Sequence, residues 1–471
     1  MANFVHYEVV VLSEGVEGYI IALLAQFYGL KTALICADIP TSNTDKQPNN
    51  QPTVLDAAAA RVFSTLGLSS HLDKNNQHPN LRHFLSQKIT EHKQIAYYHH
   101  INADKLRVDN HPEQVRLSYD GNKWNLSADF LLCGKDIPTF LQTQLFPSGG
   151  CKYTQYRPKI QLVDQINAGR IARHWRYERY FLLAGAAYRL PEWLAVGEQN
   201  ANSNVQTNES AWTLSAALQD AQNLLWKLFL VNNQRASAHL LTAYQGERQP
   251  IVAQKIAHCL SHLEYKAAQS GSFLSKLFAK SPKDNLVEQE RLGFGIIANA
   301  VDKLSNTAQR SRYIWGTYLP QYPLKGENGL LIQPDRVQMG GFMLIGWAKN
   351  PVDWLNVAEV DFLAGLRCSF LQIIPTQQPF SEQIRHTTSA QDVETQGDSN
   401  PHNWQQWFKQ HQTNFVLVRP DRVIFGTADD MEQLEELLRQ LRVKLTYQPV
   451  VFPELDDDEF YQWAEKAQVQ L

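Results

Sequence analysis

The sequence is poor in cysteine, in clustered charge and in long apolar runs. Its five cysteines, Cys36, Cys133, Cys151, Cys259 and Cys368, lie far apart with no C-x-x-C pair. This spacing predicts neither a disulfide framework nor a thiolate metal site, and a buried apolar role for each is expected. The 44 lysines and arginines nearly balance the 47 aspartates and glutamates and form no basic stripe, which argues against nucleic acid as a partner.

The first residues suit neither a signal peptide nor a membrane span. The stretch MANFVHYEVVVLSEGVEGYIIALLAQF has no basic start, and Ser13, Glu14 and Gly15 interrupt its apolar run. A cytoplasmic protein is therefore expected. With 471 residues, 44% of them hydrophobic, the chain is long enough for two or three domains that each bury a core.

Hydrophobic periodicity predicts an α/β protein. A β-branched run at 7–12, helical spacing at 17–28 and a second strand at 31–36 form an opening β-α-β unit. A helix is predicted over 54–68. A hairpin is predicted over 115–132, turning at an Asp-Gly pair.

The middle of the chain is predicted to be helical over 210–264. A break is expected near Asn232 and Asn233, and Pro250 predicts a kink or restart. Residues 266–285 have the composition of a mobile connector.

A further unit begins near residue 330. Strands are predicted within 340–348 and 414–427, followed by an acid-started amphipathic helix over 428–442. The polar insertion between these strands, 377–403, is predicted to be a disordered loop.

The turn after the first strand reads S-E-G-V-E-G. A strand, a glycine-containing turn and a helix form the geometry that binds dinucleotides, because the helix N-terminus faces the pyrophosphate. Gly15 and Gly18 occupy the second and third positions of G-x-G-x-x-G, whereas Ser13 stands at the first and Glu14 adds a carboxylate that would repel a phosphate.

The acidic residue that usually ends the second strand and holds the ribose is also missing. Cys36 stands at that position, and Asp38 lies two residues late. Taken alone, the pattern fits a closely packed β-α-β turn as well as it fits a cofactor site.

Read in order, four stretches resemble the class A flavoprotein monooxygenases that hydroxylate phenols. They are the opening unit with VLDAAAARVFSTLGL; LSADFLLCGKDIPTFLQTQL; RYFLLAGAAYRLP with the closing helices SAALQDAQNLLWKL and LLTAYQGERQPIV; and the tail segments YLPQYPL, GGFMLIGW and FVLVRPDRVIFG. The tail resembles the thioredoxin-like domain of the larger phenol hydroxylases, near the hydroxyphenylpropionate hydroxylase branch, which lacks the redox C-x-x-C.

Positions that contact FAD in that family are altered here. Lys135 and Asp136 stand where Asp and Gly belong, and Ala184 and Gly185 replace the Gly-Asp pair that holds the ribityl chain. A tract of Asn, Ser and Gln over 198–210 replaces the glycine-rich flavin loop. Only 51 positions separate Gly134 from Gly185, too few for the family's large substrate sheet.

The resemblance implies a Rossmann-like FAD-binding fold with a reduced antiparallel-sheet substrate domain and a C-terminal thioredoxin-like domain. The expected boundaries are 1–80 and 126–264 for the FAD-binding-like domain, 81–125 and 146–178 for the reduced sheet, 265–329 for a helical connector, and 330–471 for the thioredoxin-like domain.

Three functions are compatible with this pattern. The first is a non-catalytic binding or partner protein, because scaffold residues such as Asp220, Glu247 and Arg248 are kept while FAD-facing positions are altered. The second is a divergent FAD- and NAD(P)H-dependent aromatic monooxygenase, in which a serine is tolerated at the first glycine. The third is an unrelated chemistry in the same cleft.

Candidate groups for an unrelated chemistry are His99, His100, Tyr188 and Lys135, and each has a structural alternative. Adjacent histidines on a regular strand point to opposite faces and cannot easily share a metal. Lys135 with Asp136 fits an exposed ion pair, and Tyr188 fits a packing role.

The predicted cofactor contacts are Ser13, Gly15, Gly18, Asp38 and Gly185, all vestigial. FAD is expected to bind weakly or not at all, and NAD(P)H only if the protein is active. No metal is expected. The sequence leaves open an unnamed protein or small-molecule partner and a homo-oligomer.

Overall fold

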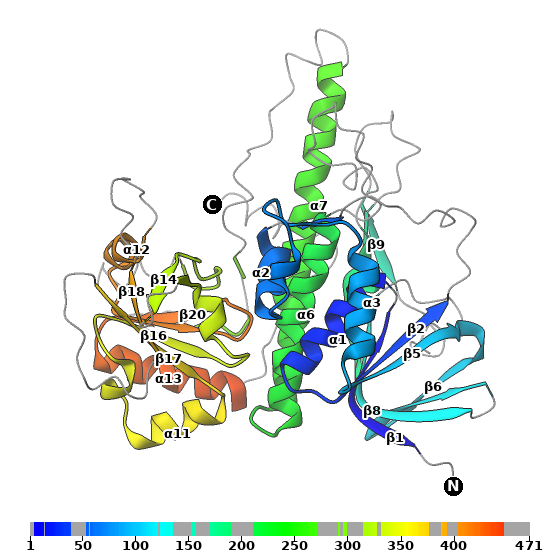
Figure 1. The fold of residues 1–471 in the computed structure, drawn as a ribbon, viewed down its shortest axis with the longest axis horizontal. Helices are drawn as coiled ribbons and strands as arrows, with labels where there is room; N and C mark the ends of the chain where they lie inside the picture. The colour runs from blue at the N-terminus through cyan, green and yellow to red at the C-terminus, as the bar shows by residue number, and fades with distance from the viewer. Residues whose placement is uncertain are drawn as a thin grey trace. The chain divides into compact units, whose positions relative to one another are not determined.

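The computed structural model describes residues 4–13, 15–38, 53–55, 57–120, 123–134, 152–156, 169–189, 211–270, 291–292, 295–298, 314–326, 331–375, 388–392 and 403–446. These residues divide into two compact units (Figure 1). The first contains those up to Leu225 and residues 248–270; the second contains Trp226–Glu247 and those from 291 onward. The division falls inside helices α6 (Ala211–Asn232) and α7 (Ala243–Ser270).

The first unit is built on a parallel sheet. Its strands lie in the order β12 (Tyr180–Leu182), β8 (Trp124–Cys133), β1 (Val5–Leu12), β2 (Thr32–Asp38) and β5 (Ile95–Asn102). The hairpin of β6 (Leu106–His111) and β7 (Gln114–Tyr119) pairs antiparallel with β8, and β11 (Arg176–Tyr177) pairs antiparallel with β12. Val9, Val10 and Val11 are fully buried in β1, as expected of a central parallel strand.

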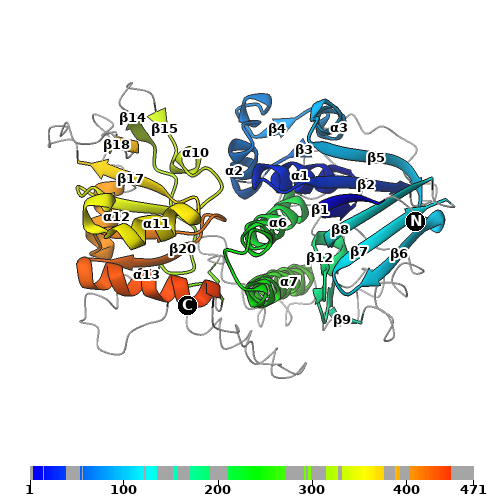
Figure 2. The ribbon, with the colours of Figure 1, turned by 90° about the horizontal axis from the view of Figure 1, so that it is seen from below.

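Helices α1 (Gly15–Phe27) and α3 (Leu81–Glu91) lie side by side and pack on this sheet (Figure 2). The smaller elements are α2 (Ala57–Thr65), α5 (Ala184–Ala187), the pair β3 (Thr53–Val54) and β4 (Gln77–His78), and an antiparallel sheet of β9 (Tyr153–Tyr156), β10 (Gly169–Ala172) and β13 (Tyr188–Arg189). The predicted α/β class and Rossmann-like opening unit are confirmed.

The second unit contains a seven-stranded mixed sheet. Its order is β15 (Leu331–Ile332), β14 (Leu324–Gly326), β18 (Thr388–Asp392), β17 (Ser369–Ile374), β16 (Met343–Trp347), β19 (Phe415–Val418) and β20 (Ile424–Ala428), and its helices are α10 (Pro334–Val337), α11 (Val357–Gly365), α12 (Trp404–His411) and α13 (Met431–Thr446). Strands β16 and β17 are parallel, and β19 is antiparallel to both β16 and β20. The strands predicted within 340–348 and 414–427 are present as β16, β19 and β20, and they lie in one sheet.

Several predicted elements differ from the structure. Pro250 does not restart the helix, because α7 continues through it from Ala243 to Ser270. The insertion 377–403 was predicted to be a disordered loop, yet β18 lies within it and pairs with β17 and β14. The mobile connector expected over 266–285 begins as the last turn of α7, and residues 271–285 lie outside the described residues.

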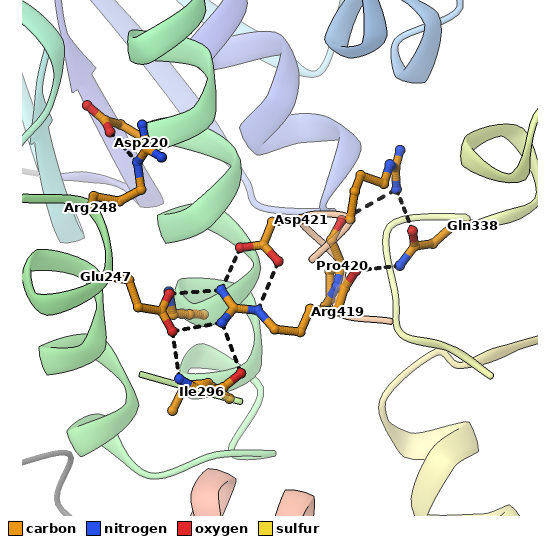
Figure 3. A network of polar contacts seen from close by, with 10 residues as sticks. Asp220, Glu247, Arg248, Ile296, Gln338, Arg419, Pro420 and Asp421 are labelled. Atoms are coloured by element: carbon orange, nitrogen blue, oxygen red, sulfur yellow. Dashed lines mark hydrogen bonds and ion pairs between the residues drawn. The ribbon is translucent and has the colours of Figure 1, made fainter. Parts of the chain in front are cut away.

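A network of buried charges lies in the second unit (Figure 3). The Arg419 guanidinium contacts both Glu247 oxygens at 2.7 and 2.8 Å and both Asp421 oxygens at 3.0 and 2.6 Å. Lys227 Nζ lies 2.7 Å from Glu247 Oε2, and the Ile296 N–H donates to Glu247 Oε1 at 2.7 Å. The two cations and two carboxylates balance, so no buried charge in this set is left uncompensated.

Replacing Glu247 by Gln should lower the free energy of unfolding by about 3–5 kcal/mol, because Arg419 and Lys227 then share only Asp421 in a dry interior. The matched double variant Lys227→Met, Glu247→Leu keeps the charges balanced and should lose less. Urea unfolding followed by tryptophan fluorescence measures both. A single variant as stable as the wild type would contradict the role assigned to Glu247.

The Glu247 carboxyl should also make the stability of the fold sensitive to acid. Burial alone would raise the pKa of Glu247, but Arg419 and Lys227 outweigh burial and hold this pKa well below its usual range. A carboxyl with a lowered folded pKa stabilises the fold above its unfolded pKa of about 4.3 and loses that effect as the pH falls below it. The stability of the Lys227→Met, Glu247→Leu variant should therefore fall less steeply below about pH 4.3 than that of the wild type, as measured by urea unfolding across that pH range.

Candidate cofactor-binding site

The altered motif positions meet at one edge of the parallel sheet. Ser13 directly follows β1, Cys36 lies near the end of β2, Gly134 follows β8, and Ala184 begins α5 just after β12. Backbone hydrogen bonds continue the pairing past the strands, from Ser13 N to Ile35 O, from Gly134 N to Leu12 O and from Leu183 N to Cys133 O. In open α/β sheets, ligands bind at this carboxyl edge.

The turn that begins α1 keeps the shape of a dinucleotide turn. Gly15 has a φ of 67°, in the left-handed region that glycine adopts without strain. A Cβ placed on Gly18 would lie 3.0 Å from both Cβ and O of Ser13, so any side chain at this position would push the helix from the strand. Gly15 therefore allows the tight turn and Gly18 allows the close approach of helix and strand, as their motif positions require.

Ser13 fits at the first glycine position because a glycine lies opposite it. The Ser13 side chain is buried, and a Cβ placed on Gly134 would lie only 2.7 Å from Ser13 Oγ and 3.2 Å from Ile21 Cδ1. The hydroxyl thus occupies the space that a side chain at residue 134 would need. The substitution of the first glycine is compensated inside the sheet and leaves the turn intact.

The end of β2 lies beside two phenols. The Tyr97 hydroxyl, on β5, lies 3.3 Å from the Tyr19 hydroxyl of α1. The Tyr19 and Tyr97 rings meet edge to face, with centroids 6.1 Å apart. Burial raises the pKa of Tyr97, with the hydrogen bond to Tyr19 and the Cys36 thiol acting in the same direction. Tyr97 therefore presents a neutral hydroxyl at physiological pH.

Helix α5 is held by a buried carboxylate. Asp220 accepts hydrogen bonds from the Tyr188 hydroxyl at 2.7 Å, from Arg248 Nε at 2.7 Å and from the Ala184 N–H at 3.4 Å. Burial raises the pKa of Asp220, and Arg248 opposes that rise. Ala184 has a φ of 49°, a conformation that costs a non-glycine residue about 1–2 kcal/mol. The packing role predicted for Tyr188 fits its burial and its ring contact with Trp175.

The two adjacent histidines break the expected alternation. Strand β5 shifts register opposite Cys36, and His100 has a φ of 55°. The rings of His99 and His100 consequently lie 4.8 Å apart, so the prediction that they point to opposite faces was wrong. Both are exposed. Among the described residues no three or more His, Cys, Asp or Glu side chains are grouped to hold a metal ion.

Several predicted positions cannot be placed. Glu14, Lys135, Asp136 and the tract 198–210 lie outside the described residues. Asp38 is the last residue of β2, and the backbone there pairs with Asn102, but the structure does not describe its side chain. Gly185 lies in α5 and supplies no carboxylate at the edge.

Three residues at the edge were not identified from the sequence. Tyr19 lies within the predicted helix 17–28, and Tyr97 lies on the strand that carries His99 and His100, but neither was predicted to contact a cofactor. No role was predicted for Gly134. A glycine directly after a buried strand, in a chain with serine at the first glycine of the turn, is the one signal that could have paired Gly134 with Ser13.

Comparisons with known proteins match two stretches of the chain, of which the first includes Ala184 and Asp220. A family model described as FAD binding domain matches residues 159–258, and one described as HcaD C-terminal domain matches residues 316–444. These matches confirm the resemblance to the class A flavoprotein monooxygenases over those two stretches.

The sequence relatives are hydroxylases of phenolic acids. A 3-(3-hydroxy-phenyl)propionate/3-hydroxycinnamic acid hydroxylase of Klebsiella pneumoniae is 26% identical over 294 residues, which cover 57% of this chain and 47% of that enzyme. An Escherichia coli O157:H7 enzyme of the same name is 25% identical over 293 residues, covering 57% and 46%. The matched segment thus spans about half the length of these relatives.

Solved structures of flavin enzymes share the fold. The flavin-dependent monooxygenase PieE, in complex with FAD and substrate, has a TM-score of 0.59 at 14% identity, covering 94% of this chain and 99% of that one. RebC with bound 7-carboxy-K252c has a TM-score of 0.62 at 12% identity, covering 93% and 99%. None of the helices in the described part of the chain has the length and hydropathy needed to span a bilayer.

The pairing of Ser13 with Gly134 predicts a reciprocal pair of substitutions. Gly134→Ala should destabilise the protein by about 1–3 kcal/mol, because the new Cβ overlaps the buried Ser13 hydroxyl. In a Ser13→Gly background the same substitution should cost much less. Thermal unfolding of the four proteins in this cycle measures the coupling. Additive effects of the two substitutions would contradict the compensation.

Proposed function

We propose that this protein is a divergent FAD- and NAD(P)H-dependent aromatic-ring monooxygenase that binds FAD much more weakly than its relatives do. Phenolic acids are the proposed substrate class, by analogy with the hydroxylases that it matches. Support comes from the two family matches and from the shared fold. The observation that carries the proposal is the intact turn, in which Ser13 is accommodated against Gly134.

The residues present fit a dinucleotide in shape better than in charge. Gly15 and Gly18 leave the start of α1 open to a pyrophosphate, whose charge the helix N-terminus favours. Asp220 fixes α5 beside the same edge. When bound, FAD would carry electrons from NAD(P)H to oxygen. The chain's own part is to hold and orient it without a carboxylate at Cys36 or Gly185.

A second candidate is the non-catalytic binding protein, and the missing carboxylates favour it. Removing a charge-assisted contact to a buried ligand costs about 1.5–3 kcal/mol, and each 1.4 kcal/mol is about tenfold in affinity. Losses at Cys36 and Gly185 together therefore weaken FAD by roughly two to four decades. If the protein is non-catalytic, the second unit, which we propose to be thioredoxin-like, would bind a partner.

Isothermal titration with FAD tests weak binding. The unmodified protein should bind FAD with micromolar or weaker affinity, and Cys36→Glu with Gly185→Asp should tighten binding by tenfold or more, because each restores a carboxylate for a ribose or ribityl hydroxyl. The control Asn75→Asp with Gln87→Glu adds the same charge at exposed positions and should change nothing.

Two results would change the proposal. Submicromolar binding of FAD by the unmodified protein would contradict weak binding. NAD(P)H consumption should rise when phenolic acids are added at saturating FAD. Its absence with every phenolic acid tried, in both the unmodified and the back-substituted protein, would favour the non-catalytic candidate.

A further inference from the structure

The ribose end of the site has lost its usual hydrogen-bonding group. In dinucleotide folds a carboxylate near the end of the second strand binds the ribose hydroxyls, and Cys36 stands there in β2. A thiol is only a weak donor and a weak acceptor. A ribose placed over Cys36 would therefore need partners from a neighbouring element.

Strand β5 supplies such a partner. Tyr97 lies on β5 opposite Leu34, two residues before Cys36 on β2, and strand alternation places Leu34, Cys36 and Tyr97 on one face. Because Cys36 and Tyr97 share a face of adjacent strands, the phenol lies beside the position that the carboxylate would occupy. The phenol is half-buried rather than enclosed in the core.

Tyr19 ties this phenol to the turn. It directly follows Gly18 in α1, and its hydroxyl lies 3.3 Å from that of Tyr97. Each phenol can donate one hydrogen bond and accept two. The hydrogen bond between the two tyrosines uses one donor and one acceptor, so it leaves acceptor capacity on the phenol oxygens. Ribose hydroxyls are donors as well as acceptors, so they match that capacity.

We propose that the Tyr97 hydroxyl, positioned by Tyr19, replaces the missing carboxylate and binds the ribose hydroxyls of an adenine dinucleotide. The inference rests on the proposed function in taking the carboxyl edge as a dinucleotide site. Tyr97 is then a binding residue that touches the cofactor, and Tyr19 is a positioning residue that acts through it.

Binding of the ribose by an uncharged phenol can be distinguished from binding by a carboxylate through the affinity that is lost when the ribose hydroxyls are removed. A hydrogen bond between uncharged groups contributes less than one to a carboxylate, so loss of the ribose hydroxyls should weaken binding by only about three- to tenfold. The same loss should be larger, by a further factor of about ten, when Cys36→Glu restores a carboxylate.

The experiment compares ADP with 2′,3′-dideoxy-ADP, using ligand-detected NMR at millimolar concentrations on the full chain. The unmodified protein should bind ADP about three- to tenfold more tightly than the dideoxy nucleotide. Tyr97→Phe should remove that preference by weakening ADP alone. Tyr98→Phe is the matched control, because Tyr98 lies on the same strand but pairs with Ile35 on the other face, with its ring against Trp124, and it should keep the preference.

Each other outcome overturns the inference. Equal binding of the two nucleotides by the unmodified protein, no binding of either, or an undiminished preference in Tyr97→Phe would do so. If Tyr97→Phe weakens both nucleotides equally, Tyr97 only supports the fold. Because ADP has no flavin, the result is independent of whether FAD binds or NAD(P)H is consumed, so failure of the monooxygenase proposal would be seen separately.

Discussion

The parallel pairing of β1 with β2 and β8 is the constraint on which the site depends. Parallel strands end at a common edge, and this pairing brings Ser13, Cys36 and Gly134 together from distant parts of the sequence. Strand β12 adds Ala184 at the same edge through its pairing with β8. A side chain at residue 134 would overlap that of Ser13, so substitutions at these two positions are expected to be coupled.

At this edge, substitutions that add volume are accommodated by the packing, whereas substitutions that remove charge are not compensated by another charged group among the described residues. The volume added by Ser13 is absorbed opposite Gly134, where no side chain competes for the space. Ala184 keeps a left-handed backbone that glycine would adopt freely, and the hydrogen bond from its N–H to Asp220 helps to hold it there. Cys36 gains a phenol partner, whereas Gly185 supplies no charge. Shape is preserved more completely than charge.

The sequence was sufficient for the fold because hydrophobic periodicity records which faces are buried. It located β1, α1, β2 and the helices α6 and α7 to within a few residues. It failed where long-range packing overrides a local rule. Pro250 is the eighth residue of α7, and the helix continues past it although it donates no N–H to the carbonyl of Gly246. His99 and His100 violate strand alternation because β5 is irregular there, and the contact of Tyr97 with Tyr19 joins residues 78 apart in the sequence.

The carboxylates that remain buried differ in function from those that are missing. Asp220 and Glu247 each satisfy a cation and a backbone N–H inside a unit, so removing either would leave an uncompensated charge in a dry interior. A carboxylate at position 36 or 185 would serve a ligand instead, and its absence leaves no buried cation without a partner among the residues named at this edge. Loss of affinity for a cofactor can therefore accumulate with little loss of stability. A well-packed Rossmann-like core is consequently no measure of how tightly this protein holds FAD.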